Sequence, residues 1–415
     1  MMMHVAMVAV ALRAIVGANV VALDGGEPIR NAVVVIEDDR IRALGPSSTT
    51  EIPAEAQIIR ADGAWLVPGL VNVHVHLGLV LPGRLAYELA DETDAELALR
   101  MAKNARETLR AGVTTIRLPG DSRHADIALA RAIERGDAEG PRIVSSGEMV
   151  DITGGHGAEG ETYDGPYELR KAVRREIAAG ASWIKIAISG GIATERGDIA
   201  EALMTPDEIE AVIDAAHRFG VKVTAHSGSP AATTTALAAG IDCIEHGYFL
   251  TREVLREMKA HGTWLVPTIV VSQPATMPFF ERIGSPPWYL ERVKTVGARH
   301  FRSLQMAIEE GVSIALGTDQ FPFEPNDGTT ATVREAEYYV EAGMTPLEAL
   351  RAATIAPATL LGLEDAIGSL APGKFADIVA LESNPSENIS ALRTMLFVMK
   401  SGRIYHDGRP NPLLE

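Results

Sequence analysis

The stretch "VNVHVHLGL", residues 71–79, sets two histidines, His74 and His76, two positions apart among small apolar residues. If this stretch forms a β-strand, both imidazoles point to the same face at neighbouring heights. Burying a polar side chain without a partner costs about 2 to 7 kcal/mol, and a divalent metal ion bound by the two histidines removes that cost. The pair therefore indicates a metal site, although an HxH pattern alone is a weak signal.

Four further residues with metal-binding or reactive side chains lie in short apolar runs later in the chain. They are Lys185 in "SWIKIAIS", His226 in "VKVTAHS", His246 in "CIEHG" and Asp319 in "VSIALGTD". Each has an ordinary structural alternative, because a buried histidine can be a hydrogen-bonded core residue, a lysine can reach solvent and an aspartate can cap a helix. The elements that carry these residues decide between the two interpretations.

Through the middle of the chain, short apolar runs alternate with longer segments of helical period. The runs cover residues 65–77, 112–120, 141–147, 182–189, 221–227, 243–247, 263–268 and 312–319. Thr205, Ser229 and Thr345 are placed to cap helices between the runs. Eight strand and helix units in series predict an α/β fold of the (β/α)8 TIM-barrel type, and a doubly wound open sheet is the alternative.

The two ends of the chain have a different pattern, in which short β-branched runs are separated by turn residues. We expect residues 1–67 and 367–415 to pair into one small β-sandwich domain. Residues 68–366 would then form the barrel, which we expect to be the metal-dependent hydrolase domain.

In a (β/α)8 barrel the active site lies at the carboxyl ends of the strands. The two histidines of the first run end it, Lys185 lies within the fourth run, and the remaining candidates end the fifth, sixth and eighth runs. Six such residues at the same end of five strands predict one metal centre in the mouth of the barrel.

Lys185 would not fit this centre as an ammonium ion. Two like charges about 4 Å apart repel by roughly 4 kcal/mol at an effective dielectric constant of about 20. The side chain must therefore be neutral or chemically altered. Reaction with carbon dioxide would make it a carbamate, an anion with two oxygens able to bridge two metal ions.

The chain resembles the amidohydrolase superfamily, and specifically its binuclear metal-dependent branch with a carboxylated lysine. The resemblance covers nearly the whole chain and rests on "PGLVNVHVHLG", "WIKIAISGG", "TAHS", "IEHG", "GTD" and the C-terminal "TIAPATLLGLEDAIGSLAPGKFADIVALESNP". A further stretch, "DITGGHGAEG" at 151–160, is similar to the "TGGH" loop of the imidazolonepropionase-like prolidases and carboxypeptidases.

The resemblance implies that the site binds two divalent metal ions, most simply zinc. One ion would be held by His74, His76 and Asp319, the other by His226 and His246, and carboxylated Lys185 and a hydroxide would bridge them.

His156 of the "TGGH" loop would be a catalytic residue that contacts the substrate; an exposed histidine in a glycine-rich loop is the alternative. The peptidases of this group often carry a tyrosine two residues after the histidine of the fifth strand, where this chain has Gly228. Tyr248 is the candidate to take over that contact with the substrate, unless it is a core or rim aromatic. The segment after Asp319, "QFPFEPNDGTT", also differs from that of the peptidases.

The implied activity is hydrolysis of an amide bond, most simply in a dipeptide by an Xaa-Pro dipeptidase or carboxypeptidase. The metal-bridging hydroxide would attack the amide, and Asp319 would act as general base and then as general acid. Alternatives are a hydrolase of an N-acyl amino acid, of a cyclic amide or imidazolone, or of a xenobiotic amide, ester or phosphotriester. A catalytically silent scaffold is the non-enzymatic alternative.

Composition restricts the partners. Lys and Arg number 38 against 55 Asp and Glu, and the net charge of −17 opposes binding to nucleic acid or to anionic membranes. The single cysteine, Cys243, excludes an intramolecular disulfide. No run has the features of a secretory signal or of a membrane span, so we expect a cytoplasmic protein.

We expect a homo-oligomer acting on a small molecule or dipeptide. The proline-rich segment 272–290 would be either a lid over the mouth or a contact between protomers.

Overall fold

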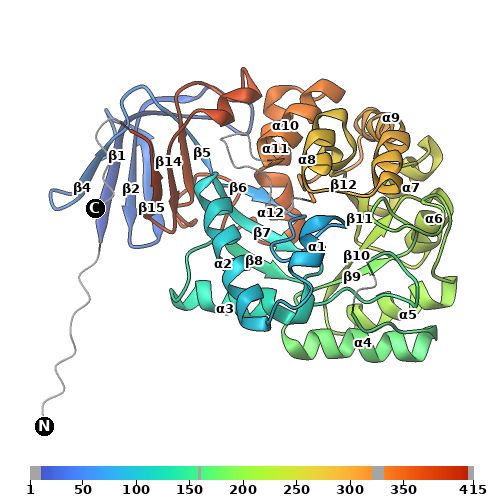
Figure 1. Cartoon of the computed structure of the whole chain (residues 1–415). Helices are drawn as coiled ribbons and strands as arrows, with labels where there is room; N and C mark the ends of the chain where they lie inside the picture. Colours follow the sequence, from blue (N-terminus) through green and yellow to red (C-terminus); the bar gives the residue numbers. More distant parts are fainter. Residues whose placement is uncertain (1–10, 158–159, 320–330, 410–415) are drawn as a thin grey trace, which may run out of the picture.

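The computed structural model describes residues 11–157, 160–319 and 331–409 (Figure 1). Figure 1 shows a region of β-strands at one end of the molecule and a region of mixed strands and helices at the other. The strands of the chain's beginning and of its end lie side by side in the first region.

Within the described residues, the β-region contains eight strands. They are β1 (Leu12–Val20), β2 (Ile29–Glu37), β3 (Arg40–Pro46), β4 (Gln57–Arg60), β5 (Trp65–Pro68), β13 (Ile378–Leu381), β14 (Met395–Lys400) and β15 (Arg403–Asp407). They form one sheet in the order β15-β14-β13-β5-β1-β2-β3, with β4 paired to β1. The two ends of the chain meet where β5 pairs antiparallel with β13.

The first strand changes its partner along its length. Residues 13–16 of β1 pair with β4, whereas Asn19 and Val20 pair with β5. A strand of this kind allows a sheet to turn over its own apolar face. That face holds a core of β-branched and aromatic side chains, which includes Ile15, Val34, Ile378 and Phe397.

Successive side chains of β13 point to opposite faces, as the geometry of a strand requires. Ile378 and Ala380 belong to the core of the terminal sheet, whereas Val379 and Leu381 join the large core of the other region. This alternation packs the terminal sheet firmly against the rest of the protein.

The second region is built from parallel strands alternating with helices. The strands are β6 (Leu70–Asn72), β7 (Val113–Leu118), β8 (Arg142–Ser145), β9 (Trp183–Ala187), β10 (Lys222–Ser227), β11 (Cys243–His246) and β12 (Trp264–Val266). Strands β6-β7-β8 form one parallel sheet and β12-β11-β10-β9 form another. A parallel bridge between Val150 and Ile186 of β9 joins the segment after β8 to the second sheet.

The longer helices that follow these strands are α2 (Asp94–Arg110), α3 (Ala125–Arg135), α4 (Gly165–Ala179), α5 (Pro206–His217), α6 (Pro230–Ala238), α7 (Arg252–His261), α9 (Pro287–Glu310) and α10 (Ala331–Ala342). Shorter ones are α1 (Arg84–Glu88), α8 (Met277–Arg282), α11 (Pro346–Ala352) and α12 (Ile355–Leu361), with single 3₁₀ turns at Ser122–His124, Ile269–Ser272, Pro274–Thr276 and Ile389–Arg393. The predicted caps are confirmed: Thr205 and Thr345 form capping boxes, and the Ser229 side chain accepts from the amide of Ala232.

Two of the eight predicted strands differ from expectation. The first run, 65–77, is divided at Gly69 between β5 in the terminal sheet and β6 in the parallel sheet. A Cβ atom at Gly69 would lie 2.1 Å from Oγ1 of Thr114, so this close crossing requires a glycine.

The eighth run, 312–319, is not a regular strand, because its backbone groups bond in several directions. Only Ile314 forms a bridge, with Leu265 of β12. The amide of Leu316 donates to the carbonyl of Ala352 at 2.8 Å, and its own carbonyl accepts from the amide of Val73 at 2.9 Å. The run therefore lies between β12 and the residues that follow β6, but it forms no continuous ladder of hydrogen bonds with either.

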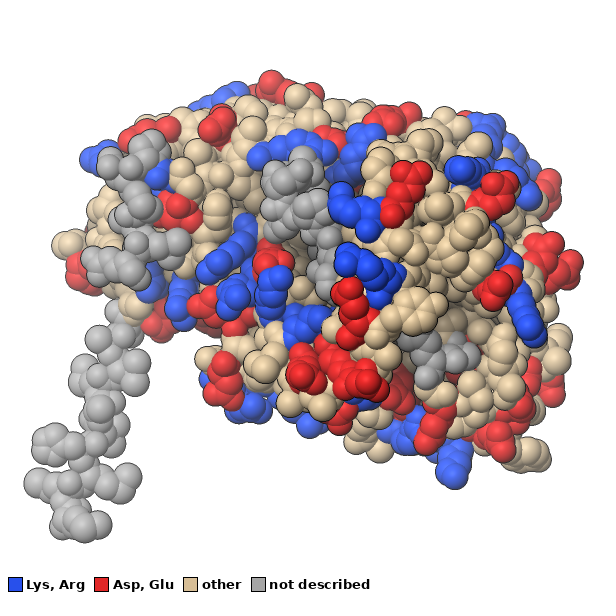
Figure 2. Space-filling view, in the orientation of Figure 1, with Lys and Arg blue, Asp and Glu red and all other residues tan. Residues whose placement is uncertain are grey.

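Lys and Arg side chains are interspersed with Asp and Glu over the face of the molecule shown in Figure 2. Among the described helices, none combines the length and the apolar character needed to cross a lipid bilayer.

Candidate active site

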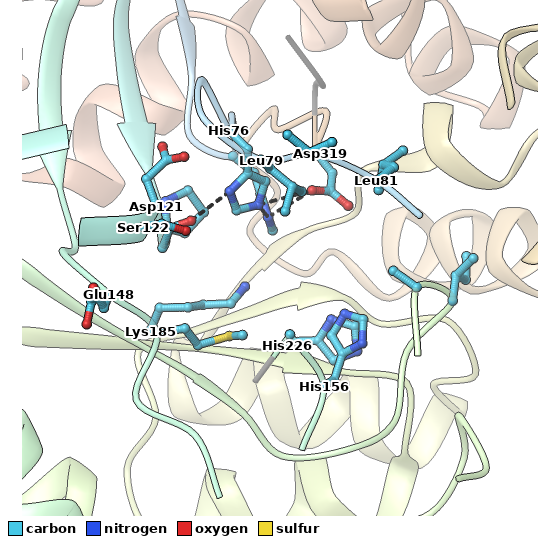
Figure 3. Close-up of a pocket in the computed structure, with 18 of the residues that line it drawn as sticks. His76, Leu79, Leu81, Asp121, Ser122, Glu148, His156, Lys185, His226 and Asp319 are labelled. Carbon is cyan, nitrogen blue, oxygen red and sulfur yellow. Dashed lines mark hydrogen bonds and ion pairs between the residues drawn. The ribbon is translucent and has the colours of Figure 1, made fainter. Parts of the chain in front are cut away.

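A cavity of about 370 Å³ lies at the carboxyl ends of the parallel strands. Its size suits a small organic ligand. The predicted site residues all line it: His74, His76, His156, Lys185, His226, His246, Tyr248 and Asp319. Figure 3 shows His76 and Asp319 on one wall, His156 and His226 on the opposite wall, and the amine of Lys185 directed into the space between them.

Three of these residues form a tight group. The Nε2 atoms of His74 and His76 lie 3.2 Å apart, and Oδ1 of Asp319 lies 3.5 Å from the first and 3.2 Å from the second. One ligand atom from each residue lies within 4.8 Å of the others, so the group could hold a metal ion. The histidines follow β6 rather than lie within a strand, and the amide of Asp319 donates to the carbonyl of His74 at 2.8 Å.

The outer nitrogens of the two histidines are already engaged. Nδ1 of His74 lies 2.7 Å from Oε2 of Glu245, and Nδ1 of His76 lies 2.9 Å from the carbonyl oxygen of Gly120. These partners orient the rings so that both Nε2 atoms face the same space. Histidine ligands of metal ions commonly have such a partner on the second nitrogen.

His226 and His246 lie beside this group. Their ring centroids are 4.5 Å apart, and the ring of His246 is 5.0 Å from that of His74. Nδ1 of His246 is 2.7 Å from Oγ1 of Thr268, and Nε2 of His226 is 3.0 Å from the carbonyl oxygen of Gly190. Each ring therefore keeps one nitrogen without a protein partner among the described residues.

The backbone is strained at two of the candidate site residues and at Thr268, the hydrogen-bond partner of one of them. His246, Thr268 and Asp319 have φ values of 66°, 52° and 53°, a left-handed conformation that costs energy for residues other than glycine. Strain of this kind is concentrated at functional sites.

Burial keeps most of the imidazoles neutral, which is the form that binds metals. It lowers the pKa of His74 and of His156 to about 4. It holds the pKa values of His226 and His246 well below their ordinary range.

The carboxylate of Asp319 is ionised in this setting. Burial alone would raise its pKa, but the neighbouring imidazoles of His74 and His76 outweigh that effect and bring the pKa to about 2. In return, the hydrogen bond with Asp319 raises the pKa of His76 against the effect of burial.

Lys185 lies in the middle of β9 with 3% of its surface exposed. Burial lowers the pKa of its amine, although the charges of Glu245 and Asp319 oppose that shift. Burial therefore shifts the amine toward its neutral form, in the direction that the sequence predicted.

His156 packs against the ring of His226, with the centroids 4.0 Å apart. Its Nδ1 atom is hydrogen-bonded to the hydroxyl of Thr194 in the loop after β9. A Cβ atom at Gly191 would lie 2.3 Å from the His156 ring, so the loop approaches this ring closely.

The site differs from the expected peptidase pattern at Gly228, as the sequence indicated. A Cβ atom there would lie 2.6 Å from the side chain of Ile199 and 2.9 Å from that of Tyr248. The Tyr248 ring stacks on that of His246, with centroids 5.1 Å apart and planes inclined by 13°. Ile199 and Tyr248 therefore occupy the space that a side chain at position 228 would need.

Sequence reasoning missed a buried charge network behind His74. Glu245 and Arg117 are both 0% exposed and form an ion pair, and the Thr224 hydroxyl also donates to Glu245. Nε of Arg117 donates to the carbonyl of Val73 at 2.7 Å. A usable signal was present, because Glu245 and Arg117 each interrupt an apolar run.

A second group of metal-binding residue types lies next to the cavity, formed by His124, Glu148 and Glu176. Nε2 of His124 is 2.7 Å from Glu176, and Arg175 lies 3.2 Å from Glu176 and 3.7 Å from Glu148. The positive charge of Arg175 therefore already offsets negative charge on these two carboxylates.

The proline-rich segment 272–290 contributes Tyr289 to the cavity wall. The carbonyl of Ile283 in this segment accepts from the amide of Arg84 at the start of α1, at 2.9 Å. The segment "QFPFEPNDGTT", residues 320–330, lies outside the described residues.

Residues 65–405 match the model of the Amidohydrolase family. Ochratoxinase of Aspergillus niger is 32% identical over 417 residues, which cover 92% of this chain and 84% of the relative. A solved Xaa-Pro dipeptidase with methionine bound in its active site is 29% identical, with a TM-score of 0.85 over 95% of this chain and 100% of that one. A prolidase complexed with N-methylphosphonate-L-proline is 30% identical, with a TM-score of 0.86 over 95% and 99% of the two chains.

These similarities extend over most of the chain, and two of the three proteins are a dipeptidase and a prolidase. The family generally uses metal ions, and His74, His76 and Asp319 form a group suited to hold one. The prediction of an enzyme that hydrolyses carbon–nitrogen bonds is confirmed, and the chain belongs to the amidohydrolase family.

Proposed function

We propose that this hydrolase uses two metal ions to cleave the amide bond of a dipeptide, as an Xaa-Pro dipeptidase or a carboxypeptidase does. The observation that carries the proposal is the position of Asp319. Its Oδ1 atom lies within 3.5 Å of the Nε2 atoms of both His74 and His76, in a cavity that Lys185 also lines.

The chemistry of the side chains fits a pair of zinc ions. His74, His76 and Asp319 would hold one ion, and His226 and His246 the other, since neutral imidazoles and carboxylates are ligands that zinc accepts. When bound, such ions polarise a carbonyl group and make hydroxide available at neutral pH.

Lys185 would join the two ligand groups as a carbamate. Its buried amine has a lowered pKa, which favours the free base that reacts with carbon dioxide. The nitrogen lone pair forms the new bond to carbon, and the amine releases one proton. The product is an anion, which suits a cavity lined by imidazoles.

Asp319 would carry the proton through the reaction. Its carboxylate is ionised at neutral pH and is held by His76, so it can accept the proton of the attacking water. It would then deliver that proton to the leaving nitrogen. His156 would orient the substrate through Nε2, because Thr194 engages its Nδ1 atom.

We extend the proposal to the fold that positions the site residues. We infer that the eight units of residues 68–366 close into a (β/α)8 barrel, with residues 1–67 and 367–415 forming a β-sandwich domain. The bridges Val150–Ile186 and Leu265–Ile314 and the hydrogen bond from Val73 to Leu316 support closure.

An N-acyl amino acid is the second candidate substrate. The cavity has an extended apolar wall formed by Leu79, Val80, Leu81, Pro82 and Val271. Such a wall suits a bulky acyl group better than a short peptide. The similarity to an ochratoxinase as well as to dipeptidases is compatible with a site that accepts more than peptides.

The test is a screen of Xaa-Pro dipeptides and N-acyl amino acids with the zinc-loaded protein and an Asp319→Asn variant. Asparagine keeps an oxygen ligand but cannot carry the proton, so we expect bound metal to remain and hydrolysis to fall by about 10²–10⁴-fold. Asp365→Asn, at an exposed aspartate, is the matched control. Retained hydrolysis in the Asp319 variant with its metal bound would remove this role.

A further inference from the structure

Two tyrosine hydroxyls at the cavity have no hydrogen-bond partner among the described residues. Tyr248 and Tyr289 line the cavity, and each has 2% of its surface exposed. Neither hydroxyl makes a hydrogen bond to another described residue, and neither oxygen is fully enclosed by protein. The small exposed area of each therefore includes its hydroxyl group. Both hydroxyls are therefore available to donate to a ligand in the cavity.

The Tyr248 ring lies close to two of the proposed metal ligands, and Tyr289 lines the same cavity. The Tyr248 ring is stacked on the ring of His246, 5.1 Å away, and stands 5.9 Å from that of His226. A tyrosine hydroxyl is protonated at neutral pH, so both phenols can act as neutral donors.

Tyr289 lies in the first turn of α9, where aromatic neighbours pack around it. Its ring packs against Phe280 at 5.0 Å and Trp288 at 5.8 Å between centroids. Three residues further along α9, the guanidinium of Arg292 donates to the carbonyls of Gly191, Glu195 and Gly197, at 3.0, 3.0 and 2.7 Å. The start of α9 is thus fixed to the loop that carries Thr194, the partner of His156.

We propose that Tyr248 and Tyr289 form a donor pair that binds the carbonyl oxygen of the scissile amide and stabilises it as negative charge develops. This assignment rests on the proposed function. It places a catalytic role on Tyr289, and it supplies the polarising group that the absence of a side chain at Gly228 leaves open. The hydroxyl protons stay on the tyrosines throughout. Preorganised donors of this kind act mainly on the transition state.

The test uses Tyr248→Phe and Tyr289→Phe, which keep the buried rings and remove only the hydroxyls. We expect each to lower kcat by about 100- to 1000-fold with little change in KM, because removal of one such donor usually costs about that factor in rate. Metal content should equal that of the parent protein. Tyr405→Phe, at a half-buried tyrosine of the terminal sheet, is the control.

A second measurement does not depend on turnover. A phosphonamidate analogue of the substrate carries the tetrahedral, anionic oxygens of the transition state, so both variants should bind it more weakly by a factor similar to the loss in kcat. Binding of the planar reaction product should change little. If the parent protein hydrolyses no amide, the proposed function fails, and the analogue's affinity alone then decides the donor pair.

Two results would overturn the donor pair. The first is unchanged kcat and analogue affinity in both variants. The second is a raised KM at unchanged kcat that appears only with substrates bearing a free carboxylate, since the hydroxyls would then bind that carboxylate instead.

Discussion

Nδ1 of His74 lies 2.7 Å from Oε2 of Glu245, and the other oxygen of this carboxylate pairs with Arg117. Burial alone would raise the pKa of Glu245, but Arg117 and His74 hold it well below its ordinary range. The ionised carboxylate accepts the Nδ1 proton of His74 and leaves Nε2 free to bind a metal. Glu245 and Arg117 thus hold His74 in the orientation that the proposed metal centre requires.

Glu245→Gln should therefore weaken metal binding. Loss of such a supporting partner typically lowers metal affinity by about 10- to 100-fold. Competition with a chromogenic chelator measures the affinity, and no turnover is needed. Since the change leaves Arg117 buried without its counter-ion, the charge-neutral pair Arg117→Met with Glu245→Gln serves as a second variant that should fold. Parent-like affinity in both proteins would show that Glu245 has no role in metal binding.

Gly191→Ala should displace His156 without touching any proposed metal ligand. The added methyl group would lie 2.3 Å from the His156 ring, and Gly191 does not have a positive φ that would itself exclude alanine. We expect kcat/KM to fall by about 10- to 100-fold, as for a misplaced binding group, with metal content unchanged.

Gly26→Ala is the control, because its added methyl group meets only the flexible side chain of Asp24 at 3.2 Å. The same substitution on a His156→Ala background should add little further loss, since the two changes remove one contact. Additive losses would mean that Gly191 acts through something other than His156.

Asp151→Asn should stabilise the protein more at high pH than at low pH. Asp151 is 1% exposed, its Oδ2 atom has no partner among the described residues, and burial raises its pKa from 3.8 to about 8. Between these values the folded state holds a proton that the unfolded state has released, so stability of the parent falls as pH rises. Asparagine does not titrate and avoids this loss.

The stability gained by Asp151→Asn should therefore grow between pH 5 and 8, by at most roughly 4 kcal/mol at about 1.36 kcal/mol per pH unit. Denaturant unfolding of both proteins at the two pH values, at equal metal concentration, measures it. The same gain at both pH values would contradict the assignment of a protonated Asp151.

The sequence predicted the parts of the fold that depend on local patterns. Apolar runs located strands β7 to β12, and the caps at Thr205 and Thr345 located two helix starts. The eighth run was wrong as a strand, because the hydrogen bonds of Leu316 to Val73 and Ala352 are tertiary contacts that no local pattern encodes.

The same distinction between local patterns and tertiary contacts applies to the candidate site. The residues for which the sequence predicted metal binding line one cavity, because strand ends that meet at one rim bring chemically distinctive side chains together. Glu245 and Arg117 were missed because their pairing joins β7 to β11 through the interior. Tyr289 was missed because it lies in the first turn of α9, where the local pattern does not show that the side chain faces the cavity.

The central claim is a pair of metal ions joined by a carboxylated Lys185. A crystal structure of the zinc-loaded protein, with anomalous scattering recorded at the zinc edge, tests it most directly. The account predicts two anomalous peaks, one among His74, His76 and Asp319 and one beside His226 and His246, with additional density bonded to Nζ of Lys185. A cavity without metal, or a single ion beside an unmodified lysine in active protein, would contradict it.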